Sequence, residues 1–178
     1  MIGKSNKASE NYDTLLFCPR NFEQVTIPSF ITVIGPYSFS MTSLTKISIP
    51  SQIIQICEGA FSDQKKVENI EIPENSELQI IEEHAFFYTS ISEIFIPQHV
   101  KELSASVFEL CADLHSVKFH KNTELQIIGK NAFFNSKIEH ISIPPTVTTI
   151  GEKAFFECVH LKSIEIPESV TSIGEGAF

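Results

Sequence analysis

The residues of this chain that could bind a metal or act in catalysis are six histidines, four cysteines and a scatter of carboxylates. A structural zinc site usually takes its ligands from close Cys or His pairs, and the sequence has no C-x-x-C. His115 and His140 could meet on neighbouring strands, but no third and fourth ligand accompany them. Glu68, Glu71 and Glu93 could also gather, although carboxylates on an open sheet are ordinarily solvated. We therefore expect no metal site.

Catalytic motifs are also missing from the sequence, which contains no G-x-S-x-G, no P-loop and no G-x-G-x-x-G. Gly129-Lys130 belongs to a repeated turn and is not a phosphate cradle. Cys111 and Cys158 occupy equivalent positions two repeats apart, roughly 9–10 Å by strand spacing, which exceeds the reach of a disulfide. The cysteines are expected to fill the core as small apolar residues. We expect no catalytic residue and no cofactor, and hence no enzyme.

Composition excludes further classes of protein. The formal net charge of −9 argues against nucleic acid as a partner, because phosphate binding needs a basic field. No apolar run approaches the roughly 18 residues of a membrane span. The first ten residues lack the apolar stretch of a signal peptide, which fits an intracellular protein or a fragment whose signal lies elsewhere.

The elements that must position any functional residue are repeats, which run through almost the whole chain. Their shared pattern is L-x-x-I-x-I-P-x-x-V-x-x-I-G-x-x-A-F, with spacings of 22, 23, 24, 23, 24 and 23 residues. We expect a polar tail over 1–13 and one domain over 14–178. The domain begins with a partial repeat over 14–21, and the complete repeats start at residues 22, 44, 67, 91, 114, 138 and 161.

Each repeat has a physical interpretation, seen most clearly from Leu161 onward. Ile164 and Ile166 alternate with a polar residue, the period of a half-buried strand, and the following proline ends that strand. A second short extended segment then leads to Gly174, for which we expect a sharp turn with positive φ. A helical or 3-10 turn is expected to cover a phenylalanine that points inward. Since no single coil can bury this much apolar surface, the coils must stack.

The phenylalanine that closes each repeat recurs in every copy, with Phe17 as its expected first member. We predict that this column forms a continuous core spine. The spine residues are Phe39, Phe61, Phe86, Phe108, Phe133, Phe155 and Phe178.

This repeat resembles the BspA-like (bacterial surface protein A-like) leucine-rich repeats over about residues 14–178. The resemblance implies a curved right-handed leucine-rich repeat solenoid, mainly β with short helical or 3-10 turns. It also implies a cell-surface protein that binds host or matrix proteins. Three middle repeats depart from the pattern, because Cys57, Glu82 and Ser104 replace the turn glycine.

In leucine-rich repeats the first strand lines the concave face, so its outward side chains are the candidates for binding a protein partner. We name eight of them: Lys46, Asn69, Glu71, Glu93, Phe95, Lys118, His140 and Glu165. Phe95 is the one aromatic residue at these positions, and it is either an anchor for the partner or an isolated surface phenylalanine.

Other surfaces leave alternatives open. Phe87, Phe134 and Phe156 each follow a spine phenylalanine, and they either form an exposed ridge or pack under the neighbouring turn. The last repeat lacks a polar cap, which predicts a homodimer through the C-terminal coil. The rival to a surface protein is an intracellular scaffold or a self-associating structural repeat protein.

Overall fold

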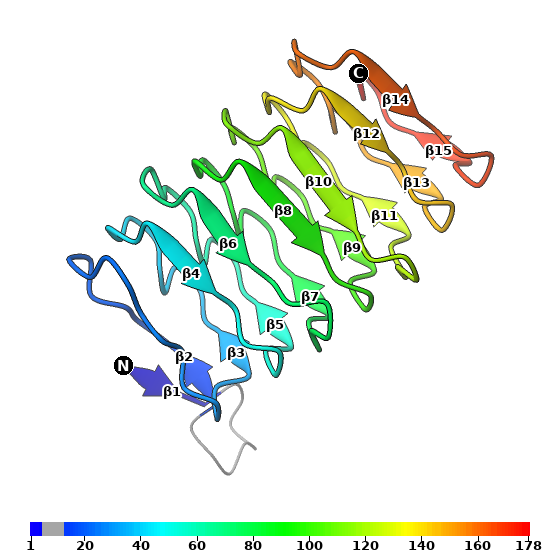
Figure 1. Ribbon diagram of the computed structural model, residues 1–178. Helices are drawn as coiled ribbons and strands as arrows, with labels where there is room; N and C mark the ends of the chain where they lie inside the picture. The colour runs from blue at the N-terminus through cyan, green and yellow to red at the C-terminus, as the bar shows by residue number, and fades with distance from the viewer. Residues whose placement is uncertain (5–12) are drawn as a thin grey trace.

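The chain winds into a stack of coils, each coil made by one repeat (Figure 1). The computed structural model describes residues 1–4 and 13–178. Within them each regular coil contributes a first strand to one sheet and a second, shorter strand to another, and no helix forms. Hydrogen-bonded turns take the place of the expected helical turns. The predicted mainly-β leucine-rich repeat solenoid is confirmed.

The strands pair in parallel, and each residue lies beside its counterpart in the next coil: Lys46 pairs with Asn69, and His140 with Ser163. The first strands are β4 (Lys46–Ser48), β6 (Asn69–Glu71), β8 (Glu93–Ile96), β10 (Ser116–Phe119), β12 (His140–Ser142) and β14 (Ser163–Glu165). The second strands are β3 (Val33–Ile34), β5 (Gln55–Ile56), β7 (Ile80–Ile81), β9 (Glu102–Leu103), β11 (Ile127–Ile128), β13 (Thr149–Ile150) and β15 (Ser172–Ile173).

The first coil differs from those that follow. Residues 22–28 form no strand, and Phe22, the first apolar position expected for this repeat, is 50% exposed. At the N-terminal end, β1 (Ile2–Gly3) pairs antiparallel with β2 (Thr14–Leu15). Ile2 and Gly3 of the expected tail therefore extend the sheet of second strands, and residues 5–12 of that tail lie outside the described residues.

The core contains a stack of phenylalanine rings, one from each coil. The rings from Phe39 to Phe155 are at most 1% exposed. Successive centroids from Phe39 to Phe178 lie 5.0–5.7 Å apart, with interplanar angles of 4–15°. Phe178 stacks on Phe155 but is itself 49% exposed, which corrects its assignment to the core. Its outer face has no further coil to cover it in this structure.

The start of this stack also differs from the prediction. The Cys18 amide donates to the Ser38 carbonyl at 2.8 Å, just as the Phe39 amide donates to the Ala60 carbonyl at 2.8 Å. Cys18, which is 2% exposed, therefore occupies the phenylalanine position of its coil, and Phe17 is 47% exposed. Assigning Phe17 to the column was wrong by one residue.

A second internal column, of small polar side chains, runs beside the rings. The Thr89 hydroxyl and the Cys111 thiol are 3.2 Å apart, and that thiol also donates to the Phe86 carbonyl at 3.1 Å. Ser136 and Cys158 repeat this contact at 3.3 Å two coils later. All four cysteines are free and buried, as expected. The column consists of Thr42, Gln64, Thr89, Cys111, Ser136 and Cys158.

The repeated glycine serves a different purpose from the one predicted. Positive φ falls elsewhere in the turns, at non-glycine residues such as Tyr37 (51°) and Leu110 (60°), and Gly174 has none. A Cβ on Gly174 would lie 2.3 Å from the backbone nitrogen of Glu152, and one on Gly151 would lie 2.6 Å from the backbone of Gly129. Glycine is therefore required because neighbouring coils approach closely there.

Candidate functional site

The first-strand face, defined as the outward side chains of β4, β6, β8, β10, β12 and β14, brings most of the predicted partner-binding residues together. Asn69, Glu71, Glu93, Phe95 and Lys118 line one hollow of about 270 Å³. Alternation along the strands produces this arrangement, because the isoleucines between these residues point into the core.

Lys46 reaches this hollow through an ion pair, and two candidates lie farther along the stack. The Lys46 ammonium is 2.6 Å from the Glu71 carboxylate. His140 on β12 and Glu165 on β14 instead contact each other's strands. The His140 ring nitrogen is 2.7 Å from the Ser163 hydroxyl, and Ser142 donates to Glu165 at 2.9 Å.

Charges on this face neutralise one another. Besides the Lys46 pair, Lys118 donates to Glu93 at 2.7 Å, and Ser48 donates to Glu71 at 2.5 Å. The bond from Lys46, with that from Ser48, lowers the pKa of the Glu71 carboxyl, and the bond from Lys118 lowers the pKa of Glu93. These carboxylates are ionised and paired at neutral pH, so they are poor candidates for general acid or base catalysis.

Phe95 lies between these ion pairs. Its ring is half-buried, and its Cα lies opposite Lys118 on the neighbouring strand. The ring meets His120 edge-on, with centroids 6.4 Å apart and planes at 74°. The result is an apolar patch surrounded by paired charges, an arrangement typical of the centre of a protein interface.

On the opposite side, the sheet of second strands is interrupted between β7 and β9. In other coils the backbone amide at the glycine position donates to the previous coil, as from Gly129 to Leu103 at 2.7 Å. At this step the Ser104 hydroxyl instead donates to the Ile81 carbonyl at 2.6 Å. No strand pairing joins β7 to β9 within residues 13–178, and a hollow of about 610 Å³ opens there.

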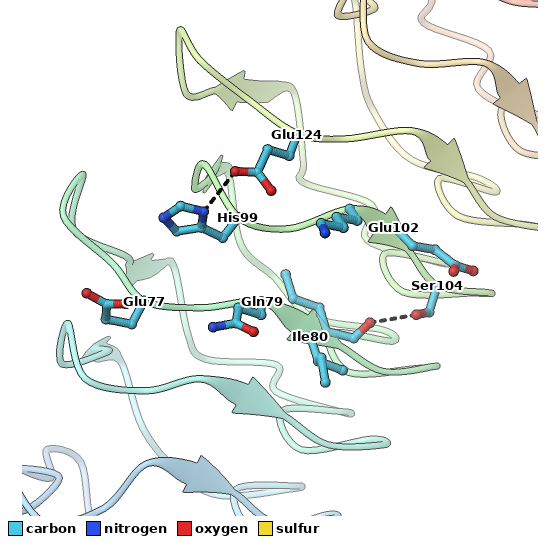
Figure 2. Close-up of a pocket in the computed structure, with 9 residues that line it drawn as sticks. Glu77, Gln79, Ile80, His99, Glu102, Ser104 and Glu124 are labelled. Carbon is cyan, nitrogen blue, oxygen red and sulfur yellow. Dashed lines mark hydrogen bonds and ion pairs between the residues drawn. The ribbon is translucent and has the colours of Figure 1, made fainter.

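This hollow contains a serine, a histidine and a glutamate, and their arrangement excludes a catalytic triad. The His99 ring nitrogen is 2.9 Å from the Glu124 carboxylate. Figure 2 shows Ser104 at the other end of the hollow from His99, with its hydroxyl directed at the backbone carbonyl. A nucleophile must be within hydrogen-bond reach of its base, so this set is not assembled for acyl transfer.

The part of the chain that the structure describes contains neither a candidate metal cluster nor a candidate membrane-spanning helix. No group of three or more His, Cys, Asp or Glu residues there is placed to hold a metal ion. Nor does that part contain a helix long and apolar enough to cross a membrane.

Sequence reasoning missed a basic hollow at the edge of the first-strand face, with a volume of about 730 Å³. Lys65, Lys66, His115 and Lys137 line it. Lys66 and Lys137 share one repeat position, directly before the first apolar residue, but Ser43, Ser90 and Asp113 stand there in other repeats, so the aligned column is not basic as a whole.

The phenylalanines that follow the spine are partly covered. Phe87 and Phe134 are half-buried, and Phe156 is 36% exposed. Phe134 and Phe156 stack with centroids 5.9 Å apart, while Phe87 meets His84 edge-on at 5.6 Å. They pack against neighbouring turns more than they form a continuous ridge.

The stacked coils and their open, polar strand face define a class of protein, the repeat solenoids that present an extended surface for binding. The chain belongs to the BspA-type leucine-rich repeat family. The family model, described as a BspA type leucine rich repeat region, matches residues 12–126 and 126–178 in six copies.

Solved structures agree with this assignment. The pneumococcal vaccine antigen PcpA is 26% identical with a TM-score of 0.68, over 78% of this chain and 35% of PcpA. A leucine-rich cell surface protein from Faecalibacterium prausnitzii is 23% identical with a TM-score of 0.55, over 91% of this chain and 48% of that one. The Treponema pallidum leucine-rich repeat protein is 20% identical with a TM-score of 0.62, over 91% and 73%.

The chain thus spans about a third to a half of the length of the first two of these proteins. No curated protein matches the sequence.

Proposed function

We propose that this chain is a non-catalytic module that binds a protein partner through its first-strand face, with Phe95 as the central contact. The observation that carries the proposal is the hollow around Phe95, where five of the eight predicted residues meet. Their charges are already paired with one another, so a partner that covers them meets little unpaired charge to desolvate.

Two variants of the purified array test this proposal in a pull-down followed by titration with the captured partner. Phe95→Ala removes the apolar contact, and Glu71→Lys places two lysines side by side. Each is expected to weaken binding by about tenfold or more, because central interface residues carry most of the affinity. The melting temperature should change little, since neither side chain is in the core.

Phe17→Ala is the matched control, because this exposed phenylalanine lies outside the first-strand face. It should bind as the wild type does. If Phe95→Ala and Glu71→Lys both keep full affinity, the partner binds elsewhere and the proposal fails.

The favoured setting is a cell surface, where the module would recognise host or matrix proteins. Support comes from two similar proteins, one described as a vaccine antigen and the other as a cell surface protein. The alternative is an intracellular scaffold. Labelling of intact cells with a membrane-impermeant reagent separates the two, since only a surface protein is modified before lysis.

Self-association through the C-terminal coil is a second candidate, favoured by its exposed apolar side chains. Ile166 is 41% exposed, Ile173 51% and Phe178 49%. Stacking of two such coils would bury these residues. Light scattering at high micromolar concentration should then show a dimer that Ile173→Lys abolishes, and a monomer at every concentration would refute it.

A further inference from the structure

The basic hollow lies at the edge of the first-strand face, at the point where each turn enters its first strand. Lys65 and Lys66 precede β6, His115 precedes β10, and Lys137 precedes β12. Three coil steps separate the first lysines from the last, which corresponds to about 14 Å along the stack at the usual strand spacing. The hollow is therefore a groove that runs across successive coils.

Most of the lysines that the structure describes outside this groove form ion pairs, although Lys101 and Lys121 form none among the described residues. Lys46, Lys118, Lys130, Lys153 and Lys162 all form ion pairs with glutamates. Lys66 and Lys137, by contrast, have no ion pair or hydrogen bond within the described part of the chain. The Lys65 ammonium lies 4.8 Å from the centre of the Tyr88 ring, a contact that leaves its charge uncompensated.

In a chain with a net charge of −9, unpaired cations gathered in one groove indicate an anionic ligand. The groove also contains two acids, Glu68 and Asp113, on the coils of Lys66 and His115. A polymer with anionic groups at every step would meet both acids and be repelled. An extended acidic peptide carries carboxylates along its side chains and N–H donors along its backbone. It can therefore match both the lysines and the two acids of the groove.

We propose that this groove binds an extended acidic segment of a protein partner. The segment would run along the stack, and at about 3.3 Å per residue roughly four residues span the three coil steps. Its carboxylates pair with Lys65, Lys66 and Lys137, and its backbone N–H groups face Glu68 and Asp113. The inference does not depend on the first-strand face, because Phe95 is not among the residues that line the groove.

Fluorescence polarisation with a fluorescein-labelled ten-residue peptide of alternating glutamate and glycine tests this proposal. The wild type should bind it saturably, and more weakly as salt is added. The double variant Lys66→Gln with Lys137→Gln should bind about tenfold more weakly, because each exposed ion pair contributes about threefold.

The matched control is the double variant Lys101→Gln with Lys121→Gln, which changes the net charge equally at exposed lysines outside the groove. It should bind the peptide within about twofold of the wild type, since long-range effects of surface charge are screened. An equal loss of peptide affinity in both double variants would show that binding depends only on net charge, and it would overturn the proposal. An absence of saturable peptide binding to the wild type would also overturn it.

Two further measurements distinguish an acidic peptide in the groove from a peptide on the first-strand face and from a sulfated polysaccharide. Phe95→Ala should leave peptide binding unchanged, and a loss would place the peptide on the first-strand face and overturn the groove assignment. Dextran sulfate should bind the wild type more weakly than the peptide at equal concentration of anionic groups. If it binds more tightly and the groove double variant abolishes that binding, the groove is a polysaccharide site and the peptide proposal is wrong.

Discussion

At the scale of single residues, the interior of this protein consists of two parallel columns with different chemistry. The phenylalanine stack supplies apolar area, and each ring from Phe61 to Phe155 is covered on both faces by the rings of neighbouring coils. The polar column beside it satisfies groups that the turns would otherwise bury unpaired, as when the Cys158 thiol donates to the Phe133 carbonyl at 3.1 Å. Each coil from Phe39 onward to Cys158 therefore contributes one phenylalanine ring and one polar or thiol side chain to the interior.

The ring stack predicts a large effect of Phe108→Ala. This ring is fully buried between Phe86 and Phe133, at centroid distances of 5.2 and 5.4 Å. Its truncation should lower the free energy of unfolding by about 3–5 kcal/mol, because a cavity remains. Urea denaturation measures the loss, and the exposed Phe17→Ala should change stability by less than about 0.5 kcal/mol. If Phe108→Ala and Phe17→Ala lowered the free energy of unfolding equally, the ring stack would not be what holds the coils together.

The buried thiols predict a loss of stability at alkaline pH. Burial raises the pKa of Cys111 from 9.0 to about 11. Between these values the folded protein keeps a proton that the unfolded chain releases, so the contribution is complete below pH 9 and is lost as pH rises toward 11. Urea midpoints measured from pH 8 to pH 10 should therefore fall less in Cys111→Ser than in the wild type. Serine suits the site because Ser136 occupies the same column, and identical pH slopes in the two proteins would contradict the assignment.

At the scale of elements, the stack depends on each coil repeating the pairing of the coil before it. Pairing is interrupted between β7 and β9 among the second strands and between β10 and β12 among the first strands. The Ser104 hydroxyl takes over the bond that a backbone amide makes elsewhere in the second-strand row. The turns on the phenylalanine side remain paired at this step, as shown by the Phe86 amide donating to the Val107 carbonyl at 3.0 Å. The interruption between β7 and β9 is therefore confined to the second-strand side of the stack at this step.

Ser104→Ala should weaken the stack at this step. Loss of the hydroxyl leaves the Ile81 carbonyl without that bond and should cost about 1 kcal/mol. Hydrogen exchange should become faster for amides of β9, because local opening becomes easier where pairing is already reduced. The exposed Ser172→Ala, at the far end of the stack, serves as control. Unchanged exchange in Ser104→Ala would mean that the hydroxyl does not hold the two strands together.

Much of this architecture could be predicted from the sequence, because inward positions carry the same chemistry in every repeat. The strand alternation of Ile164 and Ile166 and the period of the phenylalanines define the coils. The predicted alignment failed at Phe17 because β2 ends three positions before Cys18, whereas β3 ends five positions before Phe39. The reason for glycine at position 174 was also missed, since the close approach is to Glu152, 22 residues away, which no local turn pattern reveals.

The candidate site was less predictable, for a physical reason. Outward side chains are not needed for stacking, so their types vary freely and carry no periodic signal. Phe95 could be selected because it differs from its column, whereas Lys66 and Lys137 could not, because their common groove exists only once the coils are stacked.

At the scale of the whole molecule, the solenoid separates stability from recognition. The core columns hold the coils together, while the first-strand face and the basic groove beside it are free to differ between coils. Contacts in such a stack lie mainly between neighbouring coils, so substitutions on these surfaces should leave stability nearly unchanged. This separation would allow the array to serve as the docking surface that we propose.

Photo-cross-linking tests most directly whether the first-strand face is where a partner binds. The photoreactive residue p-benzoylphenylalanine would replace Asn69, on the face, or Gln126, which is exposed beside the second strands. After irradiation of each variant with the captured partner, cross-linked complex is expected from position 69 and not from position 126. Efficient cross-linking from position 126, with none from position 69, would contradict the account.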